Sequence, residues 1–290
     1  MGIHYLNKAL EALHHKAQEF IKLAKGPTLK GAAGYNIAYL EGRDPFPAKV
    51  VDFYLDPLLS YLRQYAGQGT RLLEIGAGTG RFTIPLAQAG YYVDAVEPAA
   101  PGLETIERKA REQGCVDRVK AFCGSFDDLS YFEDGSYAAC IATQSIMYCE
   151  SKDVIRKRVA ECIRVTNSVL VFDVISKYGY LLAGATDVPS TLENISYIYT
   201  KGKMPGIQTL RSENFCLLSY GELKELASFP DLVVDEIIPI CFSEVMGNRL
   251  SHKDALAVET VFRKDELMKD MSIFLLVLAH KELNSGPAQS

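Results

Sequence analysis

Between residues 70 and 175 the chain alternates short, almost continuously apolar runs with segments of helical periodicity. The apolar runs occupy residues 70–75, 91–97, 119–124, 137–143 and 168–175, and the helical segments occupy residues 81–89, 101–113 and 152–164. Strands that are apolar along their whole length are buried on both faces, as in parallel sheets covered by helices. The alternation therefore predicts a doubly wound α/β fold, with helices on both faces of a mostly parallel sheet.

Further elements flank this unit on both sides. Strand-like runs at 232–240 and 272–281 bring the expected sheet to seven strands, and helices are expected at 3–25, 47–65, 220–228 and 251–270. Pro57 is expected to kink or restart the second helix, because proline lacks the amide hydrogen that a helix interior requires. We divide the chain into an N-terminal helical extension or lid (1–66), an α/β core (67–175), an inserted cap (176–215) and a segment that completes the sheet (216–290).

Composition narrows the classes of partner. The net charge of −5 gives no attraction to a phosphate backbone, so a nucleic-acid partner is not expected. No run of eighteen apolar residues occurs and the N-terminus lacks the pattern of a signal peptide, which predicts a cytoplasmic protein without a membrane partner. The seven cysteines form no C-x-x-C pair, which favours buried, reduced thiols over disulfides or a metal site.

A glycine-rich loop follows the first apolar run. Gly76, Gly78 and Gly80 stand between that run and a helical segment, where a tight turn lets a ligand approach bare backbone. A dinucleotide-binding loop has the pattern G-x-G-x-x-G, whereas the sixth position here is Arg81. Glu74, two residues before the first glycine, would repel a diphosphate and attract an ammonium group. The loop favours a ligand that carries an amino group over NAD, and a glycine turn without a ligand is the remaining interpretation.

The stretch "LLEIGAGTG" at 72–80 resembles the first motif of the class I methyltransferases that depend on S-adenosylmethionine (SAM). The resemblance covers roughly residues 70–175 and implies that residues 67–175 are a Rossmann-like, SAM-binding core. It also implies that S-adenosylhomocysteine (SAH) is the product and that no metal is needed. By this resemblance Glu74 recognises the ammonium group of SAM. The loop residues that would lie against the ligand are Gly76, Ala77, Gly78, Thr79 and Gly80.

The same resemblance assigns roles to residues after the next three strands. Glu97, followed by Pro98, would accept hydrogen bonds from the ribose hydroxyls. After the third strand the family usually has an acidic residue directly behind a glycine, but this chain has Ser125 there. Phe126 would then pack on the adenine and Asp127 would accept from its amino group, unless Asp127 caps a short turn. After the fourth strand, Gln144 and Ser145 are expected to border the cofactor.

Methyl transfer from a sulfonium needs alignment and exclusion of water more than a strong base. Tyr148 and His252 are the candidate catalytic groups. Tyr35 and Tyr39 are expected either to cap the cofactor or to pack at the edge of the core. The aromatic insertion 176–215 would form either the acceptor pocket or a homodimer interface.

Taken together, the sequence predicts a SAM-dependent methyltransferase that acts on a small molecule. The alternatives left open are a SAM-binding sensor or partner subunit without catalysis, and a methyltransferase that acts on protein or RNA.

Overall fold

The computed structural model describes residues 48–179, 216–241 and 251–282, and every structural statement below concerns these residues. Tyr35, Tyr39, residues 1–47 of the expected lid and residues 180–215 of the expected cap lie outside the described residues. The elements in chain order are α3 (Ala48–Tyr65), β1 (Arg71–Ile75), α4 (Thr83–Gln88), β2 (Tyr92–Glu97), α5 (Ala100–Glu112), the short 3-10 helix η1 (Val116–Arg118), β3 (Val119–Cys123), the 3-10 helix η2 (Phe126–Tyr131), β4 (Tyr137–Ala142), α6 (Lys152–Val165), β5 (Thr166–Ser176), β6 (Leu217–Leu218), α9 (Tyr220–Leu226), β7 (Leu232–Ile240), α11 (His252–Phe262), α12 (Glu266–Met271) and β8 (Phe274–Lys281).

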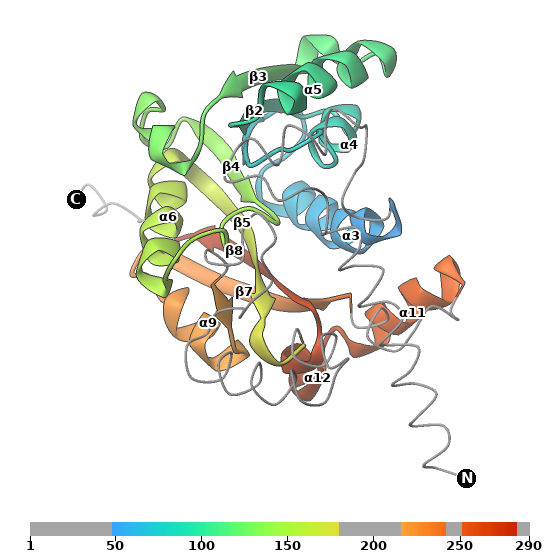
Figure 1. The fold of residues 1–290 in the computed structure, drawn as a ribbon, viewed down its shortest axis with the longest axis vertical. Helices are drawn as coiled ribbons and strands as arrows, with labels where there is room; N and C mark the ends of the chain where they lie inside the picture. The colour runs from blue at the N-terminus through green and yellow to red at the C-terminus, as the bar shows by residue number, and fades with distance from the viewer. Residues whose placement is uncertain (1–47, 180–215, 242–250, 283–290) are drawn as a thin grey trace, which may run out of the picture.

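One twisted sheet organises the described residues, in the order β3-β2-β1-β4-β5-β8-β7 (Figure 1). The pairs from β3 to β5 are parallel, and β8 runs antiparallel to both β5 and β7. The mostly parallel sheet expected from the sequence is thus confirmed, and an eighth strand, β6, pairs with β5 beside the seven expected strands. The order reverses between β1 and β4, so the carboxyl ends of these two strands flank the crevice in which α/β sheets bind ligands.

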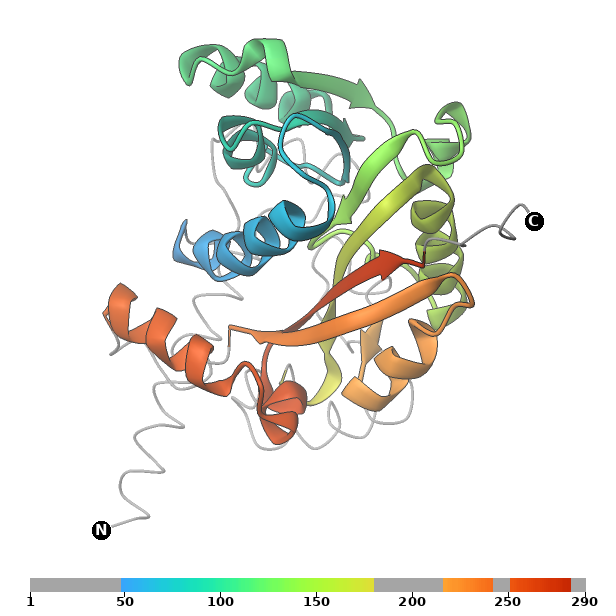
Figure 2. The same ribbon diagram turned by 180° about the vertical axis from the view of Figure 1, so that it is seen from behind.

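Helices cover the sheet on both faces (Figures 1 and 2). On one face α3 and α4 bury a cluster that contains Tyr54, Leu58 and Leu86 against alternate residues of β1, β4 and β5. On the other face α6 and α9 pack Ile155 and Leu223 against the intervening residues of the same strands. Because successive strand residues point to opposite faces, continuous apolar strands supply both clusters at once.

The structure corrects three expectations about individual elements. Residues 251–270 form two helices instead of one, because Asp265 accepts a hydrogen bond from the amide of Met268 and begins α12. The two-residue strand β6, which the sequence did not reveal, pairs with the end of β5. The helix α3 continues across Pro57, which excludes the fresh start that was one of the two expected outcomes. Of the seven cysteines six are buried as expected, whereas Cys123 is exposed.

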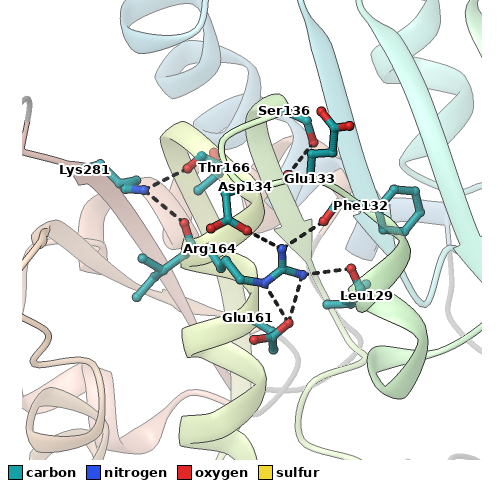
Figure 3. Close-up of polar contacts among 10 residues, drawn as sticks. Leu129, Phe132, Glu133, Asp134, Ser136, Glu161, Arg164, Thr166 and Lys281 are labelled. Atoms are coloured by element: carbon teal, nitrogen blue, oxygen red, sulfur yellow. Dashed lines mark hydrogen bonds and ion pairs between the residues drawn. The ribbon is translucent and has the colours of Figure 1, made fainter.

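Arg164, in the last turn of α6, fixes the segment that follows β3 (Figure 3). Its guanidinium donates to the carbonyls of Leu129 and Phe132, each at 2.8 Å, and to Asp134 Oδ1 at 2.7 Å. Lys281 Nζ donates to the carbonyl of Thr166 at 3.0 Å, beside the carboxyl end of the same helix. A cation at that position also complements the helix dipole. These contacts hold η2, and with it residues 125–127, at a defined place beside the sheet.

Candidate functional site

The glycine loop lies against the segment that follows β4. Gly76, Gly78 and Gly80 have φ of 76°, 59° and 80°, in the left-handed region that favours glycine. A Cβ on Gly76 would lie 2.4 Å from the Cβ of Ser145, so no side chain fits between the two segments. The Ser145 hydroxyl donates to the carbonyl of Ile75 at 2.7 Å and ties the segments together. The loop therefore packs tightly on the segment that follows β4.

Glu74 lies under this loop at the end of β1 and is 2% exposed. The hydroxyl of Thr83, in the first turn of α4, donates to its Oε2 at 2.5 Å. Burial raises the pKa of Glu74 to about 7, although the Thr83 hydrogen bond and the charge of Arg81 lower it, while the nearby Glu97 raises it further. A positive group that reached this carboxylate would relieve the cost of burying its charge.

Glu97, at the end of β2, is also buried and joins the loop to the neighbouring strand. Its Oε2 accepts from the amide of Gly78 at 2.9 Å and its Oε1 accepts from the amide of Ala99 at 3.0 Å. The two backbone amides hold the carboxylate of Glu97 in a fixed orientation. Pro98, which follows, is exposed.

The segment after β3 is organised by a capping box. Ser125 caps η2: its hydroxyl accepts from the amide of Asp127 at 3.2 Å, and its own amide donates to Asp128 Oδ2 at 2.7 Å. The cap of this turn is thus Ser125, and Asp127 is an exposed carboxylate in the first turn. Phe126 has the guanidinium of Arg158 over its ring, 4.7 Å from the centroid. One face of Phe126 is covered in this way.

Gln144, two residues beyond β4, belongs to a buried network that the sequence reasoning did not identify. Its backbone has φ of 53°, and its amide donates to Asp173 Oδ1 at 2.5 Å. The hydroxyl of Tyr54 donates to Asp173 Oδ2 at 2.5 Å, and Arg81 Nη2 donates to Gln144 Oε1 at 2.9 Å. Burial raises the pKa of Asp173 to about 7 against the hydrogen bonds from Tyr54 and Gln144. The network joins α3, β5 and the first turn after the glycine loop.

Sequence signals for this network did exist. Asp173 is the single charged residue in the apolar run 168–175, and a lone buried carboxylate must find hydrogen-bond donors. Tyr54 lies on the apolar side of a helix, where its hydroxyl also needs a partner. What the sequence could not supply was the pairing of the two, because they are 119 positions apart.

The two candidate catalytic residues occupy different surroundings. Tyr148 is partly buried beside the residues that follow β4, and Arg158 Nη1 donates to its carbonyl at 2.9 Å. His252 Nε2 lies 3.1 Å from Asp52 Oδ2, and both side chains are about half exposed on α11 and α3. In the described part of the chain, His252 makes no hydrogen bond to the residues at the strand ends. Both catalytic roles stay predictions.

No group of three or more histidine, cysteine, aspartate or glutamate side chains in residues 48–179, 216–241 and 251–282 is placed to hold a metal ion. Within the same ranges, every helix is too short or too polar to cross a membrane.

Residues 72–168 match the protein family described as "Methyltransferase domain". This segment is a methyltransferase domain. A sarcosine/dimethylglycine N-methyltransferase from Aphanothece halophytica is 33% identical to the chain over 101 residues, which are 34% of this chain and 35% of that protein. A magnesium-protoporphyrin O-methyltransferase from Rhodobacter capsulatus is 29% identical over 143 residues, 49% of this chain and 58% of that protein. The chain therefore spans less than two thirds of the length of either relative.

Solved structures extend the likeness beyond the methyltransferase domain. A SAM-dependent methyltransferase from Methanosarcina mazei superposes with a TM-score of 0.55 at 16% identity, over 78% of this chain and 96% of that chain. The magnesium protoporphyrin IX methyltransferase of Synechocystis PCC 6803, solved with bound SAH, gives 0.52 at 12% identity over 93% and 96%. At such identities the likeness shows the fold, and the described sheet has the class I methyltransferase fold that the resemblance implied.

Proposed function

We propose that this chain is a methyltransferase that uses SAM to methylate a small molecule and releases SAH. The observation that carries the proposal is the arrangement of two buried carboxylates, Glu74 and Glu97, around a loop whose first glycine admits no side chain. The arrangement lies inside a methyltransferase domain, at the carboxyl ends of β1 and β2. Bound SAM would supply a methyl group on a positively charged sulfur, already activated for transfer.

The residues present fit such a cofactor. Gly76 lets the loop pack directly on Ser145, which fixes the tight left-handed turn that a ligand would approach. Glu74 suits the ammonium group, because a cation beside it would draw its proton off and fix the carboxylate form. Glu97 is already oriented by two backbone amides, so it can receive ribose hydroxyls without reorganising. In this arrangement Phe126 and Asp127 would border the adenine.

Methyl transfer from SAM requires little acid–base catalysis by the protein. Its residues would hold the sulfonium and the acceptor atom in line and keep water away. Tyr148, in the segment that follows β4, would contact the acceptor. Residues 1–66 and 176–215 are proposed as lid and acceptor pocket. A cytoplasmic location and a homodimer built on the insertion also remain proposals.

A small-molecule acceptor is supported by the relatives' names. One relative is named for sarcosine and dimethylglycine and the other for magnesium-protoporphyrin, and the two methylate nitrogen and oxygen respectively. Because these acceptors differ in size and in the atom methylated, we assign this chain the class of acceptor and no particular compound. The net charge of −5 further disfavours RNA as the acceptor.

Calorimetric titration with SAH, SAM and NAD tests the cofactor. We expect SAH and SAM to bind and NAD to fail, and the opposite result would overturn the proposal. Incubation of the protein with methyl-labelled SAM and cell extract, followed by separation of small molecules, RNA and protein, tests the acceptor. Label is expected in the small-molecule fraction. Label in macromolecules would overturn that part, and binding without any transfer would instead indicate a SAM-binding sensor.

A further inference from the structure

A buried lysine stands at the carboxyl end of β5. Lys177 directly follows Ser176, the last residue of the strand, and is 6% exposed. Lysine is almost never buried to this extent without a partner, because its ammonium group loses its hydration. Glu222 on α9 is such a partner, and its Oε2 lies 2.8 Å from Lys177 Nζ. An ammonium group has three N–H donors, and this contact occupies one of them.

Glu222 is shared with a second lysine. Lys152, the first residue of α6, places its Nζ 2.5 Å from Glu222 Oε1, and the amide of Ser219 donates to Oε2 at 2.8 Å. Burial alone would raise the pKa of this carboxyl, but the hydrogen bonds from the two lysines and from the Ser219 amide lower it to about 2. Glu222 therefore carries one negative charge, which compensates one of two ammonium groups. One positive charge of this lysine pair, Lys152 and Lys177, is left uncompensated by Glu222.

Another buried lysine differs in this respect. Lys269 on α12 is 8% exposed, and its Nζ lies 2.5 Å from Glu266 Oε1. In the described part of the chain this ion pair joins one ammonium group to one carboxylate, so it is balanced. Lys177 is not needed for such a balance, because the half-exposed Lys152 already supplies the counter-charge of Glu222. A buried cation in excess is favourable when a further anion joins it.

The lysine pair lies at the edge of the sheet where the glycine loop also lies. Since β5 is the neighbour of β4, Lys177 stands at the same carboxyl edge as the segment that follows β4, and Lys152 comes at the end of that segment. The amide of Cys216 donates to the carbonyl of Met147 at 3.0 Å. This bond holds the start of β6, and with it the turn into α9, against the same segment.

The order of the strands separates the lysine pair from the nucleoside end of the proposed cofactor. Glu97 ends β2 and residues 125–127 follow β3, so both lie on one side of β1. The lysine pair follows β4 and β5, on the other side of β1. Tyr148, the proposed contact of the acceptor, lies in the segment between β4 and Lys152. A charge at this place therefore concerns the acceptor more than the nucleoside.

We propose that the lysine pair binds an anionic oxygen group of the methyl acceptor, a carboxylate or a phosphate, with Lys177 as the main contact. The acceptor is then a small anion, held by its charged group at the end of β5 while the atom to be methylated lies near Tyr148. Charge-assisted hydrogen bonds are stronger in a buried place than in water, so one buried ammonium group can select anions. The inference rests on the proposed function, because it names the class of acceptor used at the same site.

The first test asks which small molecules accept the methyl group. The small molecules of a cell extract are separated on a quaternary-ammonium anion exchanger into an unretained and a retained fraction, and the retained anions are recovered with a volatile salt. Each fraction is then incubated with the protein and methyl-labelled SAM. We expect labelled products mainly from the retained fraction. Labelled products mainly from the unretained fraction would overturn the inference and leave the proposed function intact.

The second test removes the charge of Lys177. Lys177→Met replaces the ammonium group by an apolar group of similar length and leaves Lys152 to balance Glu222, so the variant should melt at or above the wild-type temperature. We expect the apparent KM for the retained fraction to rise at least about tenfold, because a hydrogen bond to a charged group is lost. The affinity for SAH, measured by calorimetry, should equal that of the wild type. Lys177→Gln takes the place of Lys177→Met if that variant does not fold.

Lys269→Met is the matched control, because it removes a similarly buried ammonium group from a balanced ion pair. We expect the control to keep the wild-type KM for the retained fraction. An unchanged KM in Lys177→Met, or equal increases in Lys177→Met and Lys269→Met, would overturn the inference. A loss of SAH affinity in Lys177→Met would also overturn it, since the effect would then reach the cofactor. Failure of the wild-type protein to methylate any small-molecule fraction would instead overturn the proposed function.

Discussion

Replacing Gly76 by alanine tests the geometry on which the site depends. The left-handed backbone, with φ of 76°, costs an L-residue about 1–2 kcal/mol. The new methyl group would also lie 2.4 Å from Ser145 Cβ, an atom fixed to the backbone, so the two segments must move apart. Such overpacking costs about 1–3 kcal/mol, which brings the total to about 2–5 kcal/mol. The entropy of unfolding is about 2.1 cal/mol/K per residue, and the shift in melting temperature is the change in the free energy of unfolding divided by the total entropy. For the 290-residue chain the melting temperature should therefore fall by about 3–8 °C.

Gly67→Ala is the matched control, and calorimetric melting is the assay. Gly67 has φ of 70° but no atom within 4 Å of its added Cβ, so it should incur the backbone cost alone, about 2–3 °C. A second check places Gly76→Ala in a Ser145→Gly background. Because this background removes the clashing atom, the cost of Gly76→Ala should fall to that of the control. Equal effects of Gly76→Ala and Gly67→Ala in the wild-type background would refute the reasoning.

Three further predictions concern charge and support around the site. Burial raises the pKa of Glu74 and of Asp173 to about 7, so between about pH 4 and 7 the folded state binds more protons than the unfolded state. The free energy of unfolding should therefore fall as pH rises through this range. Urea titrations at several pH values should show that fall, with a shallower one in Glu74→Gln; a rise with pH would contradict the assignment. Arg164→Ala should lower the free energy of unfolding by about 2 kcal/mol, because it removes the hydrogen bonds to two carbonyls and to Asp134. The control Arg108→Ala breaks an exposed ion pair with Glu112 and should lower the free energy of unfolding by about 0.5 kcal/mol or less in the same urea assay. Equal effects of the two would show that the Arg164 contacts add no stability. Glu97→Gln should weaken the binding of SAH by about tenfold in calorimetry, and the binding of 5′-methylthioadenosine, which lacks the amino-acid group, by the same factor. The reason is that Glu97 is proposed to bind the ribose, which both ligands contain. A loss confined to SAH would show that Glu97 does not bind the ribose.

The sequence predicted the parallel strands closely, because their apolar runs are continuous and bounded by turn residues. The run 70–75 became β1 at Arg71–Ile75, and the run 91–97 became β2 at Tyr92–Glu97. The failures arose where a single local contact decides the outcome. Periodicity continues through residues 251–270, yet the hydrogen bond from Met268 to Asp265 starts a new helix there. The strand β6 is two residues long, too short to leave a pattern, and exists through its pairing with β5.

The residues of the candidate site also fall into those that the sequence indicated and those that it did not. Glu74 and the three glycines could be selected from the sequence because they stand in one contiguous motif, and Glu97 because it ends the next apolar run. In the structure the amide of Gly78 donates to Glu97, so the loop and Glu97 lie together. The network of Tyr54, Asp173 and Gln144 was not predictable, because its members come from three elements that only the folded chain brings together. Gln144 was expected to border the cofactor, and this stays a prediction. The sequence did not indicate its left-handed backbone or the hydrogen bond from its amide to Asp173 in the neighbouring strand.

The distribution of buried charge explains why a cationic amino acid suits this site better than a diphosphate. Glu74 and Asp173 are both fully buried, and the charge of Arg81 lowers the pKa of each. One guanidinium cannot compensate two carboxylates in a medium of low polarity, so near pH 7 the ligand-free protein holds extra protons in their place. An ammonium group can replace such a proton, because it brings the missing positive charge to Glu74. A diphosphate would add negative charge beside Glu74 and Glu97 and increase the imbalance that burial creates.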